Sequence, residues 1–188
     1  NPLVKVTIVP RGRALGAAWY LPEERQITTK EQMLDEMCAL LGGRAAEDVF
    51  LGRISTGAMN DLERVTKQAY AMIAYFGMSR ELPNLSYYNN NEYNFSKPYS
   101  EKTAELIDIE AKRLINTQYE RAKDLLKEYS KQHNKLAEEL MDKEVILADD
   151  VEAIFGKRKW KSRTDEIMAL QLEEKRKEEA KKNKEENK

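Results

Sequence analysis

The sequence has very few of the side chains from which disulfides and zinc sites are most often built. Its 188 residues include one cysteine, Cys38, and one histidine, His133. A single cysteine excludes a disulfide within the chain and a zinc site made of several cysteines. A single histidine cannot supply the two imidazoles of a His-x-x-x-His pair. The residues around His133 are polar, so we expect its side chain to be solvated or partly packed.

Long hydrophobic runs are missing as well. No apolar stretch approaches the ~20 residues of a membrane-spanning helix, and no signal-peptide pattern is present. We therefore expect the chain itself to be soluble. It begins with Asn1 and Pro2 rather than Met, which leads us to expect a fragment of a longer protein.

The formal net charge of −1 hides an asymmetry along the chain. Residues 157–188 hold 12 Lys and Arg against 8 Asp and Glu, a net of +4, which leaves −5 for residues 1–156. Glutamates are interspersed among the lysines of this tail, which makes it a poor polybasic patch. We expect a frayed helix that becomes disordered at its lysine-rich end, and no nucleic-acid partner.

The first twenty residues carry the persuasive β signal. Apolar residues alternate with polar ones over residues 3–9, which predicts a half-buried strand with Val4, Val6 and Ile8 on one face. Residues 14–21 suit a second strand. Glycines at 12 and 16 suggest turns or a close approach of two backbones.

From residue 29 onward the apolar spacing is helical. Thr29 and Gln32 form a capping-box pattern at the start of a helix that extends to about residue 49. Gly42 and Gly43 interrupt this segment, at a cost of roughly 1 kcal/mol for each helical glycine relative to alanine. Such a pair either splits the helix or lets another backbone come close.

Further helices are expected along the rest of the body. One extends from about residue 60 to residue 76 and ends at Gly77, and the longest begins at Ser100. The side chains expected on the inner face of the helix that begins at Ser100 are Ala104, Ile107, Ala111, Leu114, Gln118, Ala122, Leu125 and Tyr129. The patterns together predict a mainly α protein, a helical bundle with a small β unit at its N-terminus. We divide it into a β unit (3–21), helices (29–77), a loop (78–99), a bundle (100–156) and a charged tail (157–188).

Asp61, in the stretch "ISTGAMNDLERVT" (54–66), is the most suggestive candidate for chemistry. An acid in the first turn of a helix interacts favourably with the positive end of the helix dipole, worth about 0.3–1 kcal/mol. Alternatively, the small-residue turn before it presents Asp61 to a cleft as a metal ligand or an acid–base group. Asn60 could cap the same helix, which would free Asp61 for such a role.

Glu47 and Asp48 form a second acidic pair, in "GGRAAEDVF". Adjacent side chains on a helix point about 100° apart, so we do not expect these two carboxylates to act as a catalytic pair. Arg44 lies three residues before Glu47, which favours an ordinary ion pair between them.

Three longer motifs resemble one known family. "KVTIVPRGRALG" (5–16), "LLGGRAAEDVFLG" (40–52) and "STGAMNDLERVT" (55–66), with "FGMS" (76–79) after them, are similar to the peptidase domain of FtsH, the membrane-anchored, ATP-dependent zinc metalloprotease of the AAA class. The resemblance covers roughly residues 3–155. It makes residues 1–156 a zinc peptidase domain that is truncated at its N-terminus.

The resemblance implies a specific role for Asp61. In this family two histidines of a His-Glu-x-x-His helix and a later aspartate bind zinc, and the aspartate corresponds to Asp61. The glutamate of that helix is the general base, and zinc activates water and polarises the scissile carbonyl. This chain contains no His-Glu-x-x-His. We therefore expect it to be inactive alone, with no catalytic residue of its own.

The resemblance also implies partners for the complete protein. These are unfolded or membrane polypeptides as substrates, sibling subunits in a homo-hexamer, and ATP with Mg²⁺ in a separate ATPase module. Membrane attachment would come only from N-terminal helices outside this chain. The family favours the bacterial inner membrane, with this domain in the cytoplasm, over an organellar membrane.

Two further expectations concern binding. In zinc peptidases the substrate commonly adds as a strand to a sheet edge. Residues 12–19 would form this edge, and the residues expected to bind substrate are Gly12, Arg13, Ala14, Leu15 and Gly16. The alternative to an enzyme fragment is a non-catalytic helical module that binds other proteins. A His-Glu-x-x-His immediately upstream would favour the protease, and a segment without histidines the module.

Overall fold

The computed structural model describes residues 2–12, 14–21, 27–87, 98–158 and 172. The chain forms two compact units, Gln26–Ser130 and Asn1–Arg25 with Lys131–Lys188. The described residues are mainly helical, with one small sheet, so the predicted fold class is confirmed. The tail expected at residues 157–188 lies almost entirely outside the described residues.

The helical unit begins with α1 (Lys30–Ala46), whose start was predicted correctly. The Thr29 hydroxyl accepts the Gln32 N–H at 3.3 Å, and the Gln32 side chain accepts the Thr29 N–H at 2.9 Å. This capping box satisfies two amide donors that the first helical turn would otherwise leave unpaired.

Neither of the two alternatives expected for Gly42 and Gly43, a split helix or a close approach of another backbone, is found. α1 passes through both glycines and continues as a π-helical turn, η1 (Glu47–Leu51), before Gly52 ends it with a φ of 62°. A Cβ built at Gly42 or Gly43 meets nothing within 4 Å, so no described backbone lies close to the pair. The burial of Met33, Met37, Cys38, Leu41 and Ala45 along the helix outweighs the poor helix propensity of the two glycines.

The second helix of this unit is built in the same way. A short 3-10 turn, η2 (Thr56–Ala58), leads into α2 (Met59–Tyr70), and a π-helical turn, η3 (Ala71–Tyr75), continues it. Gly77 follows with a φ of 60°, as predicted for the end of this helix. The Gly77 carbonyl accepts the Asn84 N–H at 3.2 Å, so the next segment folds back onto the helix end.

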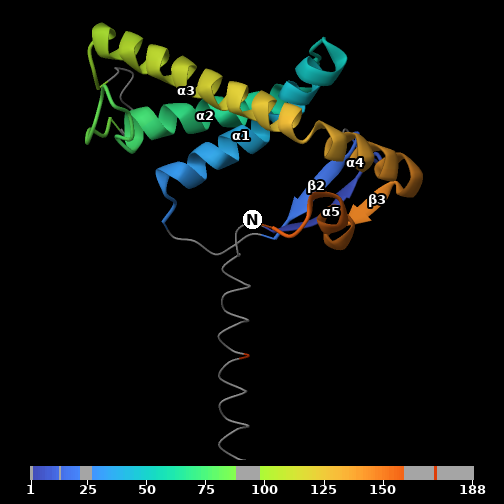
Figure 1. Ribbon diagram of the computed structural model, residues 1–188. Helices are drawn as coiled ribbons and strands as arrows, with labels where there is room; N and C mark the ends of the chain where they lie inside the picture. The colour runs from blue at the N-terminus through green and yellow to red at the C-terminus, as the bar shows by residue number, and fades with distance from the viewer. Residues whose placement is uncertain (1, 13, 22–26, 88–97, 159–171, 173–188) are drawn as a thin grey trace, which may run out of the picture. The chain divides into compact units, whose positions relative to one another are not determined.

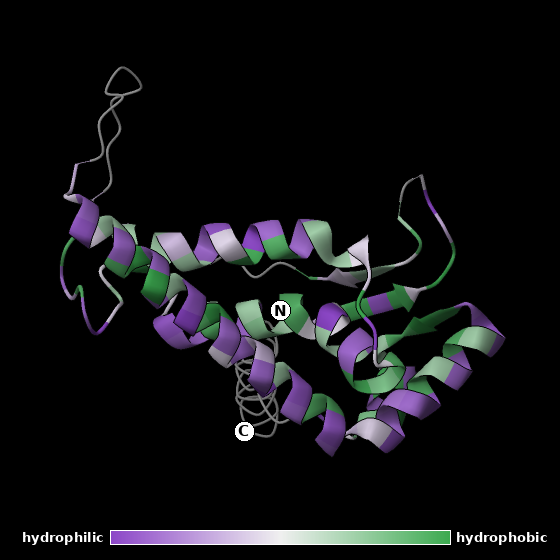
Figure 2. Cartoon of the chain, turned by 90° about the horizontal axis from the view of Figure 1, so that it is seen from above, coloured by the Kyte–Doolittle hydropathy of each residue, from purple (hydrophilic) through white to green (hydrophobic). Residues whose placement is uncertain are grey.

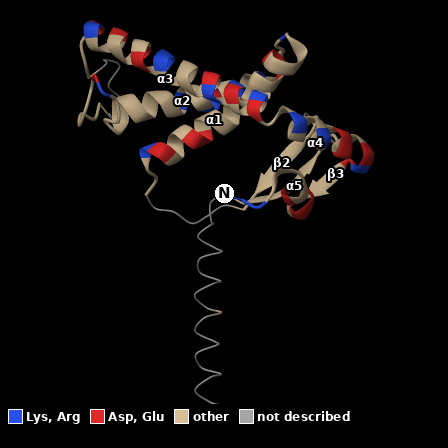
Figure 3. Ribbon diagram, in the orientation of Figure 1, with Lys and Arg blue, Asp and Glu red and all other residues tan. Residues whose placement is uncertain are grey.

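α3 (Glu101–Glu128) is the longest helix and packs against both α1 and α2 (Figure 1). Its predicted N-cap is confirmed, because the Ser100 hydroxyl accepts the Thr103 N–H at 3.3 Å. Lys and Arg are interspersed with Asp and Glu along its length (Figure 3). Leu125, expected on the inner face, is instead 42% exposed.

A carboxylate occupies the inner side of α3, where the sequence pattern did not predict one. Glu110 is 6% exposed and accepts hydrogen bonds from Arg113 Nε at 2.8 Å and Nη2 at 2.9 Å. The Ser79 hydroxyl donates to the same carboxylate at 2.7 Å. These donors compensate for burying the charge, so Glu110 ties the segment after Gly77 to α3.

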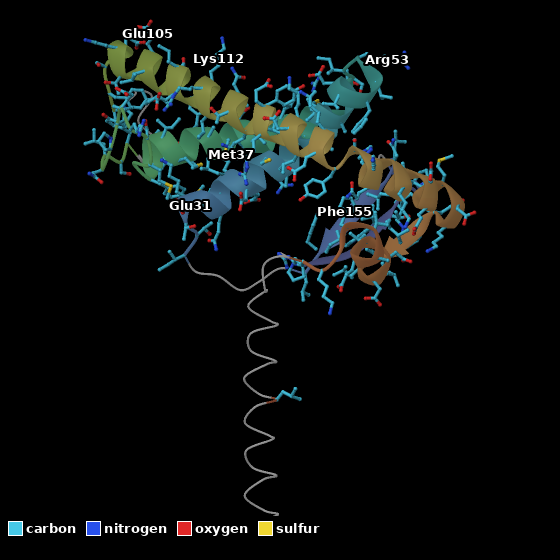
Figure 4. The ribbon with its side chains drawn as sticks, viewed as in Figure 1. Glu31, Met37, Arg53, Glu105, Lys112 and Phe155 are labelled. Atoms are coloured by element: carbon cyan, nitrogen blue, oxygen red, sulfur yellow. The ribbon has the colours of Figure 1, made fainter. Side chains whose placement is uncertain are left out.

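The core of the helical unit lies where these helices meet. Met37, labelled in Figure 4, is completely buried on α1. The buried apolar side chains are Met33, Met37, Cys38, Leu41, Ala45, Val65, Ala69, Met72, Ile73, Ala74, Leu82, Ile107, Ala111 and Ala122.

The second unit contains a three-stranded antiparallel sheet in the order β2-β1-β3, with hydrophobic residues along its strands (Figure 2). β1 (Leu3–Thr7) and β2 (Ala17–Tyr20) match the two predicted strands, whereas β3 (Val145–Leu147) was not predicted. β1 is the central strand, and Val6 pairs with Ala18 on one side and Ile146 on the other. β2 and β3 are therefore the two edges of this sheet.

The faces of β1 differ in detail from the alternation in the sequence. Val4 and Ile8 are 45% and 38% exposed, whereas Thr7 is buried. The Thr7 hydroxyl donates to the Glu144 carbonyl at 2.9 Å, which compensates for burying it, and the Ile8 N–H donates to the same carbonyl at 3.1 Å. Glu144, directly before β3, is therefore hydrogen-bonded to the end of β1.

Two helices complete this unit. α4 (Ser130–Lys143) precedes β3, and α5 (Ala148–Phe155) follows it and packs against β1 and β3. The start of α5 is held by Asp150, whose carboxylate accepts the Leu147 N–H at 2.9 Å and pairs with Lys143 at 2.8 Å.

Candidate metal centre

Asp61 lies in the first turn of α2, half-buried. Asn60 is not the cap of this helix, contrary to the sequence-based expectation. α2 begins at Met59, its N-cap position is Ala58, and that residue provides no side-chain hydrogen bond. The 3-10 turn η2 (Thr56–Ala58) leads directly into α2 instead, so Asn60 and Asp61 lie inside the first turn of α2.

The turn before Asp61 is capped by a residue that the sequence analysis did not single out. The Ser55 hydroxyl accepts the Gly57 N–H at 3.2 Å, and Ser55 is the N-cap of η2. Serine favours this position because its short side chain reaches an amide two or three residues ahead. The start of α2 is therefore ordered from Ser55 rather than from Asn60.

Glu47 holds Ser55 in place. One oxygen of the Glu47 carboxylate accepts the Ser55 N–H at 2.9 Å, and the other accepts the Ser55 hydroxyl. These two hydrogen bonds hold the pKa of Glu47 below its usual range. The expected ion pair with Arg44 is not formed among the described residues, and Arg44 acts on Glu47 only through its charge at a distance.

Asp48 has different partners from its neighbour, as expected for adjacent helical residues. Its carboxylate accepts the Tyr119 hydroxyl at 2.9 Å and lies 3.5 Å from Lys123 Nζ. Burial and this hydrogen bond raise the pKa of Tyr119. The two acids therefore connect η1 to the turn before α2 through Glu47 and to α3 through Asp48.

Arg53, labelled in Figure 4, marks the short connection between η1 and Ser55.

The described residues fit a role as a partial metal site. The Asp61 carboxylate takes part in no side-chain hydrogen bond or ion pair within the described part of the chain, so its oxygens are available as ligands there. Carboxylate oxygen is an accepted zinc ligand. No group of three or more His, Cys, Asp or Glu side chains within the described segments is arranged to hold a metal ion. Asp61 could therefore supply one ligand to zinc.

The single histidine and the single cysteine also belong to no cluster of metal-binding side chains among the described residues. His133 is half-buried on α4, in agreement with the expectation that it is solvated or partly packed. Cys38 belongs to the apolar core, where burial raises the pKa of its thiol. A buried thiol with a raised pKa is a poor ligand and a poor nucleophile.

The segment predicted to bind substrate forms the connection between β1 and β2. Arg11 and Ala14 exchange two backbone hydrogen bonds at 2.9 and 3.1 Å, and Gly12 has a φ of 61°. Leu15 is 83% exposed. Arg13 lies outside the described residues.

Gly16 provides the close backbone approach that the sequence suggested. A Cβ at this position would lie 2.7 Å from the Thr7 carbonyl oxygen, so Gly16 allows the second strand to fold against the first. The approach is to β1 of this chain. β2, which follows Gly16, is an edge strand of the sheet.

Comparison with known proteins assigns the family. Residues 1–154 match the family model described as peptidase family M41. The chain is 68% identical over 173 residues to an ATP-dependent zinc metalloprotease FtsH from Parabacteroides distasonis, covering 91% of this chain and 25% of that protein. It is 52% identical over 158 residues to an FtsH of the same description from Karelsulcia muelleri, covering 82% of this chain and 25% of that one. It is 49% identical over 163 residues to the mitochondrial ATP-dependent zinc metalloprotease FTSH 10 of Arabidopsis thaliana, covering 86% of this chain and 20% of that protein.

The chain belongs to peptidase family M41, and it corresponds to the peptidase domain of FtsH-type zinc metalloproteases. It spans a quarter or less of the length of these relatives. Across the described residues, none of the helices combines the length and the apolar character needed to cross a membrane.

Proposed function

We propose that this chain is part of an ATP-dependent zinc metalloendopeptidase that degrades unfolded and membrane proteins. The observation that supports this most directly is the family match over residues 1–154, which includes Asp61 at the start of α2. The named relatives are ATP-dependent zinc metalloproteases.

Asp61 would be the aspartate ligand of the zinc ion. Bound zinc supplies Lewis-acid activation of water and of the peptide carbonyl. The remaining ligands, two histidines, and the general-base glutamate would come from a His-Glu-x-x-His segment outside these 188 residues. One carboxylate is too few ligands for tight zinc binding, so the chain alone would neither retain zinc nor hydrolyse peptides.

The sheet edge at β2 would bind the substrate as an added strand. An edge strand presents backbone N–H and C=O groups that an extended peptide can pair with. The loop from Gly12 to Gly16 leads into this strand, and the exposed Leu15 side chain offers an apolar contact beside it. Substrates would be bound mainly through their backbones, which suits a protease that acts on many unfolded polypeptides.

The remaining parts of the activity would lie in the rest of the protein. An ATPase module that uses ATP and Mg²⁺ would unfold substrates, and the subunits would form a homo-hexameric ring. Membrane helices outside this chain would anchor the protein in a bacterial inner membrane, with this domain in the cytoplasm.

The test of the zinc site uses the longer protein that includes the upstream His-Glu-x-x-His segment. Asp61→Ala should lower the bound zinc per subunit and abolish casein hydrolysis. The control is Glu63→Ala on the same helix, which removes an exposed acid whose ion-pair partner is Lys67 at 2.6 Å. Unchanged zinc occupancy in Asp61→Ala would contradict the ligand assignment. An upstream segment without histidines would favour the alternative, a non-catalytic module that binds other proteins.

The edge-strand proposal needs substitutions that spare Gly16, because any side chain there disturbs the contact with Thr7. Along an edge strand, successive N–H groups point alternately to the neighbouring strand and outward. Of Ala17→Pro and Ala18→Pro, one therefore removes a ladder hydrogen bond and the other removes an outward donor. We expect the variant that keeps the wild-type melting temperature to degrade casein more slowly. A wild-type rate in that variant would show that substrates do not pair with β2.

A further inference from the structure

One row of side chains crosses the three-stranded sheet and ends at Trp19 on its β2 edge. Lys5 on β1 pairs with Leu147 on β3 and with Trp19 on β2. Residues that lie directly opposite each other on antiparallel strands place their side chains on the same face of the sheet. Trp19 is therefore the last side chain of this row, at the edge to which a further strand could be added.

Lys5 restricts the orientation of the Trp19 ring. Its Nζ atom lies over the indole, 4.5 Å from the ring centroid. The negative face of an aromatic ring attracts a cation in this position. Trp19 is half-buried, so part of its side chain stays accessible beside β2. A strand added at this edge would therefore meet an aromatic side chain that is already held in place.

The two neighbouring rows end in small side chains. Val6 pairs with Ala18, and Thr7 pairs with Ala17. At both positions the β2 edge offers an added strand only a methyl group. A substrate strand would thus find room for side chains of many sizes beside Ala17 and Ala18, and a large apolar surface beside Trp19.

The other aromatic residue of β2 belongs to the opposite face. Side chains alternate between the two faces along a strand, so Tyr20 and Trp19 would neighbour different residues of an added strand. Tyr20 pairs with Leu3 and is 54% exposed. Among the described residues no cation lies over its ring, so Tyr20 lacks the restriction that Lys5 places on Trp19.

We infer that Trp19 is a specificity-determining residue, which favours substrates that place an aromatic side chain opposite it on the strand added to β2. The inference rests on the proposed function, in which substrates pair with this edge. Opposite residues on adjacent strands have Cβ atoms about 4.5–5.5 Å apart. This spacing suits the centroid separation of about 4.5–7 Å at which two aromatic rings attract each other. Trp19 thereby adds a preference at one substrate position to an edge that otherwise binds backbone.

The distribution of cleavage sites tests the inference. The longer protein, with its ATPase module and the upstream segment, digests a mixture of caseins, and mass spectrometry locates every cleaved bond. In wild type, aromatic residues should be enriched at one fixed position relative to the cleaved bond. Trp19→Ala should lower this enrichment roughly 2- to 10-fold, the factor that corresponds to one aromatic pair, and leave the other positions unchanged. Trp19→Phe should keep most of the enrichment.

The enrichment compares sites within one digest, so it does not change when fewer molecules are folded. The matched control is Leu147→Ala, which removes a side chain that is 55% exposed at the far end of the same row. Its cleavage profile should equal that of wild type. An equal loss of enrichment in Leu147→Ala and Trp19→Ala would overturn the inference, because the loss would then follow the integrity of the sheet.

The outcomes also separate the inference from the proposed function. If the longer wild-type protein cleaves no casein, the proposed function fails. If it cleaves casein but the proline variant of β2 that keeps its melting temperature does so at the wild-type rate, pairing with the edge fails, and the role of Trp19 fails with it. If both of these tests support the proposed function but Trp19→Ala keeps the wild-type cleavage profile, Trp19 does not determine specificity.

Discussion

Substitution of Gly77 by alanine should destabilise the helical unit more than the same substitution at Gly52. Both glycines follow a π-helical turn, and both adopt a left-handed backbone, with φ values of 60° and 62°. A Cβ at Gly77 would lie 2.9 Å from the Asn84 nitrogen and 2.9 Å from the Leu85 nitrogen and oxygen. A Cβ at Gly52 would meet nothing within 4 Å. The two sites therefore share the backbone strain and differ in steric contact.

The expected magnitudes follow from this difference. A residue with a side chain in the left-handed region costs about 1–2 kcal/mol, and this is the whole effect expected at Gly52. At Gly77 the new methyl group also presses on backbone atoms, which cannot rotate away, at a further cost of about 1–3 kcal/mol. Gly77→Ala should thus lower the free energy of unfolding by about 2–5 kcal/mol in total.

Urea unfolding followed by circular dichroism at 222 nm measures both variants under the same conditions. Both glycines belong to the helical unit, so the comparison concerns one structural unit. The reasoning is refuted if Gly77→Ala loses no more stability than Gly52→Ala. Such a result would mean that the segment at residues 84–85 moves aside without cost.

The remaining predictions concern the core and a buried acid. Met37→Ala should lower the free energy of unfolding by about 2–5 kcal/mol because Met37 is completely buried, whereas Met59→Ala, at a site 68% exposed, should stay within about 0.5 kcal/mol of wild type in the same urea assay. Glu110→Gln should cost about 1–3 kcal/mol at neutral pH, since it leaves donors of Arg113 without their carboxylate. Hydrogen bonds from Arg113, with one from Ser79, hold the pKa of Glu110 below its usual range, so its contribution to stability is present above the unfolded value of about 4.3 and is lost as the pH falls through the lower folded pKa. Acid unfolding curves of Glu110→Gln should therefore be flatter below about pH 4 than those of wild type, and identical slopes would contradict this account.

The parts of the fold that were predicted well depend on local interactions. The capping box at Thr29, the N-cap at Ser100 and the end of a helix at Gly77 each involve groups within a few residues of one another. Local geometry and residue type are enough to define such features. The same applies to the β1 and β2 strands, which neighbour each other in the sequence.

The parts that were missed depend on distant partners. β3 has only three residues, and it is a strand because Ile146 pairs with Val6, far away in the sequence. The burial of Glu110 on α3 depends in part on Ser79, 31 residues earlier, whose hydroxyl donates to its carboxylate. Leu125 is exposed although its spacing fits the inner face of α3. Periodicity cannot distinguish these cases, since burial is decided by which elements come to lie against the helix.

The candidate site divides in the same way. The sequence alone determined that Asp61 stands at a helix start after a small-residue turn, and the three motifs around it determined the resemblance to a zinc peptidase. Only the tertiary structure decided how that turn is held. From the sequence, Glu47 had a nearby arginine as its natural partner, and Asn60 was the natural cap. The π-helical turn and the left-handed Gly52 turn the chain back, so that Ser55 comes within reach of Glu47. There the carboxylate makes two hydrogen bonds to one ordered residue, which stabilise it more than a solvent-exposed ion pair with Arg44 would.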